Sequence, residues 1–137
     1  MIRRPPRSTQ GVSSAASDVY KRQDLETWKT KEKFDIIFSM ESLYYSVPME
    51  PALEKVFKLL KKGGIFYCGT DFYSDNTLTT RWIKDMNVPM DLRSEKEWKK
   101  MFKEIGFSTR SKHVTDPKNK SKWKREFGTL FVIGRKP

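Results

Sequence analysis

The sequence contains few of the residues that build disulfides and metal sites. Among its 137 residues it has one cysteine, Cys68, and one histidine, His113. A single cysteine excludes an intrachain disulfide and any zinc site made from several cysteines. The lone histidine has no second histidine or cysteine at ligand spacing, so the sequence does not predict a metal centre. Cys68 lies inside an apolar, strand-like run, which favours a buried, unreactive thiol over a nucleophile.

Long apolar runs are also missing. No run approaches the ~18 residues that a membrane-spanning helix needs, so we expect a soluble protein of the cell interior, cytoplasmic, that does not enter a membrane. Positive charge, in contrast, is in excess, with 28 Lys and Arg against 17 Asp and Glu, a formal net charge of +11. Many of these lysines fall on the polar faces of expected helices, where solvated lysine is ordinary. Because solvated lysines account for much of this charge, the charge alone does not predict a nucleic-acid partner, and we regard nucleic acid as an unlikely one.

The first 23 residues resemble translated sequencing adapters rather than protein. Residues 1–9 (MIRRPPRST) read as one library adapter in frame, and residues 13–23 (SSAASDVYKRQ) read as the matching transposon-type adapter. The three residues between them leave room for a sample index. We therefore exclude residues 1–23 from the fold and expect them to be disordered, with a partial domain at 24–137 that starts in the middle of a gene.

Removing this segment lowers the charge of the remaining chain. It carries five basic residues and one acidic residue, so +7 remains on residues 24–137. Those 114 residues are enough for one domain, although they are few for an α/β fold.

The remaining chain alternates between strand and helix patterns. Residues 34–39 (FDIIFS) form a short apolar run without strict alternation, typical of a strand covered on both faces. From 49 to 60, apolar residues recur at helical spacing and form one stripe. Gly63 and Gly64 then end this helix, and residues 65–71 (IFYCGTD) form a second apolar run. A strand, a helix and a strand within ~40 residues predict a right-handed βαβ unit with parallel strands.

The second half of the chain has a different order. Residues 77–86 favour a short helix, which Pro89 follows. A clearer helix begins at Ser94, where Ser94 and Glu97 form a capping box, and it ends at Gly106. Residues 107–114 and 127–134 read as strands joined by a lysine-rich loop. Since no helix separates these two strands, they should pair antiparallel.

This order resembles the C-terminal half of a class I S-adenosylmethionine-dependent methyltransferase, similar to the methyltransferase type 11 family. In that Rossmann-like α/β fold the strand order is 3-2-1-4-5-7-6 and strand 7 is antiparallel. The FDIIFSMESLYY segment looks like strand 4 with its loop, and LLKKGGI looks like the "LKPGG" turn into strand 5, with Lys62 in place of proline. The resemblance covers residues 24–137 and implies a truncated sheet of strands 4, 5, 6 and 7.

The resemblance also implies a cofactor and an acceptor site. S-adenosyl-L-methionine would approach the end of strand 4, at Ser39, Met40 and Glu41, because ligands of open α/β sheets bind at the carboxyl ends of the strands. The methyl acceptor would lie near four residues that end strands 4 and 5 or follow them: Tyr44, Tyr45, Asp71 and Tyr73. Strand termination is the alternative for Ser39 and Glu41, and core packing is the alternative for both tyrosines after strand 4.

The segment from Phe72 to Arg93 should cover the acceptor pocket. Arg81 and Trp82 are candidates for this lid, although an exposed helix without such a role explains them as well. The glycine-rich turn after strand 1 and the acidic end of strand 2 have no counterpart in the chain. We therefore expect the fragment itself to be inactive.

We expect the function to be methyl transfer to a small organic molecule. An RNA- or protein-directed methyltransferase is one alternative, because a cluster of basic residues (Lys118, Lys120, Lys122, Lys124 and Arg125) surrounds Trp123. A flexible, solvated hairpin loop explains the same residues more simply. A non-catalytic Rossmann-like binding subunit is another. The sequence nominates no general base and does not indicate the oligomeric state.

Overall fold

The computed structural model describes Leu25 and residues 28–137. The expected disorder of residues 1–23 lies outside these described residues. The strands are β1 (Phe34–Met40), β2 (Leu60–Thr70), β3 (Ser108–Val114) and β4 (Thr129–Arg135). The helices are the 3-10 turn η1 (Leu43–Tyr45), α2 (Glu50–Leu59), α3 (Trp82–Met86), α4 (Glu95–Ile105) and α5 (Lys122–Glu126).

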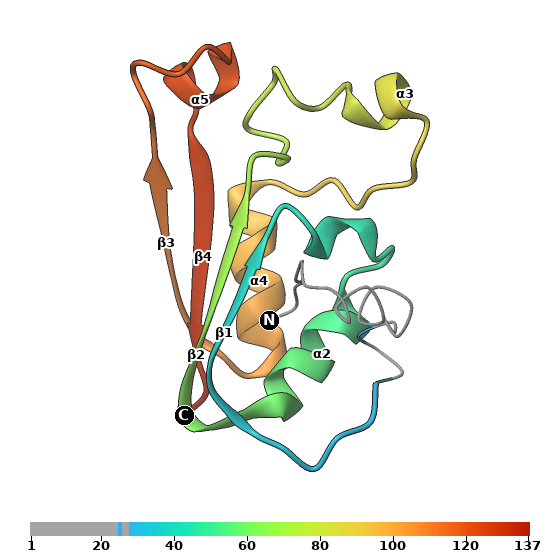
Figure 1. The fold of residues 1–137 in the computed structure, drawn as a ribbon, viewed down its shortest axis with the longest axis vertical. Coiled ribbons are helices and arrows are strands. Elements are labelled where there is room, and N and C mark those ends of the chain that lie inside the picture. Colours follow the sequence, from blue (N-terminus) through green and yellow to red (C-terminus); the bar gives the residue numbers. More distant parts are fainter. Residues whose placement is uncertain (1–24, 26–27) are drawn as a thin grey trace, which may run out of the picture.

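The four strands form one mixed sheet in the order β1-β2-β4-β3 (Figure 1). β1 and β2 are parallel, whereas β4 is antiparallel to both β2 and β3. This is the predicted order 4-5-7-6, with the C-terminal hairpin antiparallel as expected. The α/β class and the truncated Rossmann-like sheet are thus confirmed.

Helix α2 follows the predicted stripe but ends one residue earlier. Leu53 and Val56 are completely buried, and Pro51 stands in the first turn, where a missing N–H costs little. Leu60 already belongs to β2, because it pairs with Phe34 of β1 across an irregularity in register. The second strand therefore begins five residues before the expected Ile65, and Gly63 lies in this strand with a φ of 85°.

Helix α4 begins as the sequence predicts. The Ser94 side chain accepts a hydrogen bond from the Glu97 N–H, and the Glu97 carboxylate accepts one from the Ser94 N–H. Trp98 and Phe102, on the inner face of this helix, are completely buried. Gly106 ends the helix with a φ of 129°, a conformation that favours glycine.

Two short helices differ from expectation. Only residues 82–86 of the expected helix at 77–86 are helical, because Asn76–Thr79 forms a separate turn and Asn87 adopts a left-handed conformation with φ 53°. The lysine-rich loop predicted between the two C-terminal strands contains α5. The Arg125 guanidinium donates to the carbonyls of Asn119 and Lys120, which stabilises this compact turn.

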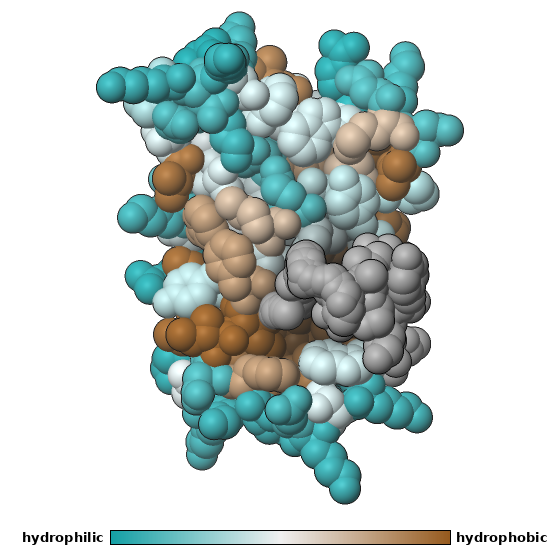
Figure 2. Space-filling model, in the orientation of Figure 1, coloured by the Kyte–Doolittle hydropathy of each residue, from teal (hydrophilic) through white to brown (hydrophobic). Residues whose placement is uncertain are grey.

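The sheet has one covered face and one open face. α2 and α4 lie together on the first, where Ile37 and Phe66 are buried. Alternation along the strands places Ile36 and Phe38 on the other face, where they are 62% and 49% exposed. Figure 2 shows the resulting apolar patch over the strands, bordered by hydrophilic side chains. Among the described residues, none of the helices is long and apolar enough to cross a lipid bilayer.

Candidate active site

The carboxyl ends of β1 and β2 meet at one edge of the sheet, as parallel strands require. The chain leaves β1 after Met40 and leaves β2 after Thr70, and the Glu41 N–H donates to the Gly69 carbonyl at 2.9 Å. β4 begins at the same edge, since Leu130 pairs with Thr70. Residues that follow two strands and precede a third therefore converge there.

Glu41 occupies the turn out of β1 in a strained conformation. Its φ is 53°, in the left-handed region that few non-glycine residues adopt. One carboxylate oxygen accepts a hydrogen bond of 2.7 Å from the Asp71 N–H. Burial, with a further contribution from the negative charge of Asp71, raises the pKa of Glu41 to about 7. Glu41 is therefore a carboxyl group that exchanges a proton near neutral pH.

The other two predicted cofactor residues lie on opposite sides of β1. Ser39 is buried, and its hydroxyl oxygen lies 2.8 Å from that of Ser42 in the following turn. Met40 points to the open face and is 40% exposed. All three residues thus border the same strand end, while Glu41 presents its carboxyl group directly at the edge.

The two tyrosines of η1 differ in exposure. Tyr44 is almost completely buried, whereas Tyr45 is 47% exposed, and their ring centroids lie 4.7 Å apart. Burial raises the pKa of the Tyr44 phenol above its ordinary value, and nearby Glu41 adds to the effect. Tyr44 is therefore a neutral group at the inner side of the edge, and Tyr45 is the one open to solvent.

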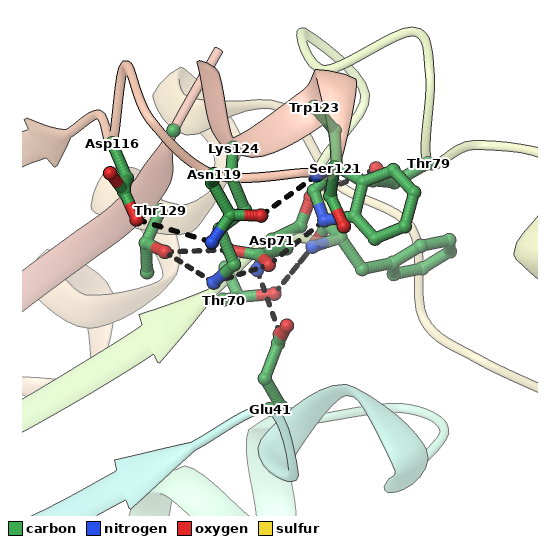
Figure 3. Close-up of polar contacts among 12 residues, drawn as sticks. Glu41, Thr70, Asp71, Thr79, Asp116, Asn119, Ser121, Trp123, Lys124 and Thr129 are labelled. Carbon is green, nitrogen blue, oxygen red and sulfur yellow. Dashed lines mark hydrogen bonds and ion pairs between the residues drawn. The ribbon is translucent and has the colours of Figure 1, made fainter. Parts of the chain in front are cut away.

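Asp71 is the centre of a buried polar cluster that joins four segments (Figure 3). One carboxylate oxygen accepts from the Thr129 hydroxyl at 2.6 Å, and the other from Lys124 at 2.7 Å and from the Trp123 indole N–H at 3.2 Å. Its backbone carbonyl accepts from Thr79 at 2.8 Å. A buried carboxylate requires this number of partners, and here they bind α5 and the start of β4 to the end of β2.

Tyr73 contacts the C-terminal hairpin rather than the sheet edge. It is completely buried, and its hydroxyl donates toward the carbonyls of Phe127 and Gly128 at 3.1 Å. The same oxygen lies 3.3 Å from the His113 ring nitrogen. The other nitrogen of that ring lies 2.7 Å from Glu95 of α4. Asp71 and Tyr73, both predicted near the acceptor, thus each bind the segment that precedes β4.

The lid segment from Phe72 to Arg93 is fastened at its far end. The Asp91 N–H donates to the Tyr44 carbonyl at 2.8 Å, and the Asp91 carboxylate accepts from the Met49 N–H at 3.0 Å. Arg93 donates to both carboxylate oxygens of Glu50 at 2.7 and 2.8 Å, which lowers the pKa of Glu50. The segment consequently returns to the turn after β1, beside the candidate site.

Comparison with known families shows to which protein family the chain belongs. A model of a methyltransferase domain matches residues 5–112, well over half of the chain. The chain belongs to the methyltransferase domain family. The matched range begins inside the segment that we interpret as adapter, and that interpretation stays a prediction. No curated protein matched the sequence.

Solved structures share the fold of this methyltransferase chain. One is from a complex between the Haloferax volcanii Trm112 methyltransferase activator and a methyltransferase, with a TM-score of 0.77 and 24% identity over 84% of this chain. The N-methyltransferase NodS from Bradyrhizobium japonicum, bound to S-adenosyl-L-homocysteine, has a TM-score of 0.62 and 20% identity over 84% of this chain. The chain spans 60% and 52% of the lengths of these two structures.

A third structure extends the same comparison. It is a SAM-dependent methyltransferase of Thermotoga maritima, described as a possible histamine N-methyltransferase. Its TM-score is 0.65 at 17% identity, over 84% of this chain and 62% of that one. At these identities the three likenesses establish the fold of the methyltransferase chain and not its substrate.

Sequence reasoning missed three residues of the Asp71 cluster: Trp123, Lys124 and Thr129. It interpreted Lys124 as a solvated loop residue, whereas Lys124 forms an ion pair with a carboxylate that is 2% exposed. These partners lie 52 to 58 positions from Asp71, too far apart for any spacing rule. The one available signal was an aromatic residue inside an otherwise polar lysine-rich loop.

Proposed function

We propose that this methyltransferase chain is part of an enzyme that transfers a methyl group from S-adenosyl-L-methionine to a small organic acceptor, and that it acts in the cytoplasm. The family match supports the assignment as a transferase. Glu41, Asp71 and the tyrosines of η1 converge at the carboxyl edge of the sheet, which supports this edge as the active site. Because the chain spans 60% of the first structure that it matches, the complete activity belongs to a longer protein in this proposal.

The end of β1 fits one part of the cofactor. Glu41 offers a half-buried carboxylate, which attracts the positive sulfonium, and Ser39 offers a hydroxyl. Met40 adds an apolar surface on the other side of the strand. When bound, S-adenosylmethionine supplies a methyl group that is already activated, so the protein mainly has to hold the acceptor atom in line with it.

The acceptor lies on the lid side of the same edge in this proposal. Tyr45 offers an exposed ring, and Tyr44 supports that ring from beneath. Asp71 and Tyr73 bind the hairpin through hydrogen bonds, so they shape this side of the site from behind. Glu41 is the group that accepts the acceptor's proton, because its pKa of about 7 leaves a sizeable ionised fraction at neutral pH.

The contacts of the lysine-rich loop favour a small acceptor over RNA. Lys124 is paired with Asp71, Lys122 lies 3.7 Å from Glu126, and Arg125 donates to two carbonyls of its own loop. Cations with protein partners are less available to phosphates. An RNA- or protein-directed enzyme and a non-catalytic binding subunit stay alternatives that the following experiment also tests.

Calorimetry on the protein extended by its upstream coding sequence, taken from an uncontaminated copy of the gene, tests the proposal. We expect S-adenosylmethionine to bind with micromolar affinity and nicotinamide dinucleotide not to bind. Glu41→Ala should weaken cofactor binding, whereas Glu104→Ala, an equal change on the exposed face of α4, should not. Dinucleotide binding without cofactor binding would refute the proposal, and a steeply salt-dependent affinity for RNA would favour the first alternative. The 137-residue chain alone should transfer no methyl groups.

A further inference from the structure

Five aromatic side chains form a continuous series along the carboxyl edge of the sheet. Tyr45 contacts Tyr44 with ring centroids 4.7 Å apart, and Tyr44 contacts Phe72 at 5.1 Å. Phe72 stacks on Trp82 at 6.1 Å, and Trp82 meets the edge of Trp123 at 5.5 Å. All four distances fall in the range that aromatic pairs prefer. The series joins the turn after β1, the lid and α5.

The members of this series are not equally buried. Tyr44 and Phe72 are almost completely buried and belong to the core. Tyr45 is 47% exposed, and the two tryptophans are half-buried. The inner rings thus support three outer rings that keep part of their surface open to solvent at the same edge as Glu41.

Trp123 is oriented by a buried charge. Its indole N–H donates to the Asp71 carboxylate at 3.2 Å, and Lys124 pairs with the same oxygen at 2.7 Å. Trp98 provides the contrast: it is completely buried in the core, and its indole N–H has no hydrogen-bond partner among the described residues. Packing alone is therefore enough to place a core tryptophan in this protein, whereas the half-exposed Trp123 has a dedicated anchor.

We infer that Tyr45, Trp82 and Trp123 form an aromatic wall for the methyl acceptor, and that this acceptor carries a flat aromatic ring. The inference rests on the proposed function for the identity of the bound molecule. Offset-stacked and edge-to-face contacts with two tryptophans recognise a flat ring better than a saturated ring of equal size. Asp71 and Lys124 are positioning residues in this arrangement, since they act through Trp123.

The test uses the indole N–H signals of the ¹⁵N-labelled 137-residue chain. Its four tryptophans, at positions 28, 82, 98 and 123, give four signals, which single Trp→Phe variants assign. The probes are unlabelled indole, cyclohexanol as a saturated ring and tetramethylammonium as a cation. Indole should shift the signals of Trp82 and Trp123 saturably and leave Trp98 unchanged, while the other two probes produce much smaller shifts.

Two variants with matched controls sharpen the test. Trp123→Leu should weaken indole binding about fivefold, and Trp28→Leu, at the opposite end of β1, should not weaken it. Lys124→Met should displace the Trp123 signal and weaken indole binding, whereas Lys122→Met, which removes a lysine paired only with exposed Glu126, should change neither. An altered Trp123 signal with unchanged indole affinity would remove the positioning role of Lys124.

The outcomes separate this inference from the proposed function. Equal shifts by indole and cyclohexanol, stronger binding of tetramethylammonium, or shifts confined to Trp28 would each overturn the aromatic wall, whether or not the extended protein binds the cofactor. Selective indole shifts together with no cofactor binding by the extended protein would instead retain the aromatic site and refute methyl transfer.

Discussion

The two faces of the sheet are made by the same strands, yet they differ sharply in packing. On the face that α2 and α4 cover, Ile37 and Phe66 are 4% and 0% exposed. Ile36 and Phe38, on either side of Ile37 in β1, point to the other face and are 62% and 49% exposed. A strand that is apolar on both faces is typical of a sheet that is covered on both faces, whereas the described helices cover only one face of this sheet. The comparison predicts where substitutions of equal chemistry should have unequal effects.

The largest difference should come from removing an aromatic ring from each face. Phe66→Ala deletes a buried ring that stacks on Phe102 at 5.7 Å, and should lower the free energy of unfolding by about 3–5 kcal/mol. Phe38→Ala makes the same change on the open face and should cost about 1 kcal/mol or less. Urea denaturation of both variants measures the difference, and equal losses would show that the two faces are equally packed.

Adding a methyl group to a strand glycine sharpens the comparison. An alanine Cβ at position 134 would lie 2.6 Å from the Phe107 ring and 2.9 Å from the Phe102 ring on the covered face. Gly134→Ala should therefore cost about 1–3 kcal/mol. At Gly69, on the open face, the added Cβ would lie 2.5 Å from the sulfur of half-exposed Met40 and 2.9 Å from the ring of half-buried Phe131, and both side chains can shift toward solvent. Thermal unfolding of Gly69→Ala should accordingly show the smaller loss of the two.

The carboxyl edge of the sheet, where Glu41 lies, should add its own pH dependence to the free energy of unfolding. The pKa of Glu41 is raised from an unfolded value of 4.5 to about 7, so the folded state binds the extra proton between these values. The contribution of Glu41 to stability is then largest below about pH 4.5 and is lost as the pH rises through about 7. Glu41→Gln, which stays neutral, should be about 1–2 kcal/mol more stable than the parent at pH 8 and equal to it at pH 4.

The measurement is urea denaturation of both proteins across this pH range. Glu104→Gln on the exposed face of α4 serves as the control, and its stability should follow the parent at every pH. Parallel pH profiles for the parent and Glu41→Gln would contradict the assignment of this pH dependence to Glu41.

The smallest effect on stability, but a visible one on solution behaviour, should follow from Ile36→Lys. β1 pairs only with β2 among the described strands, and an apolar edge strand promotes pairing between molecules. The substitution should reduce self-association in sedimentation velocity while it changes the free energy of unfolding by about 0.5 kcal/mol or less. Thr77→Lys adds the same charge away from the edge and should leave self-association unchanged; a fully monomeric parent chain would contradict this view of β1.

Much of the fold was predictable because its signals are local. The stripe of α2, the capping box of α4 and the two apolar runs each lie within about a dozen residues, where periodicity and end signals operate. The errors also have local causes. β2 begins early because Leu60 pairs with Phe34, a contact that no pattern around Gly63 reveals. α5 was assigned to loop because a five-residue helix is too short to show a period.

The candidate site was predictable only in outline. Ser39 and Met40 lie at the carboxyl end of β1, and Glu41 directly follows it, as the sequence predicted; their role in cofactor binding stays a prediction. The exposure of the two tyrosines was not predictable, since neighbouring residues in a single turn point to different surroundings. The contact between Tyr73 and the hairpin also depends on how distant segments meet.

By itself, the sequence determined the class of fold, the order of its elements and the edge of the sheet that holds the candidate site. Hydrophobic periodicity and helix caps are properties of neighbouring residues and need no tertiary context. Only the tertiary structure decided which side chains share that edge. Asp71 reaches Trp123, Lys124 and Thr129 across more than 50 positions because the antiparallel hairpin returns β4 to the end of β2, and burial there makes each hydrogen bond necessary.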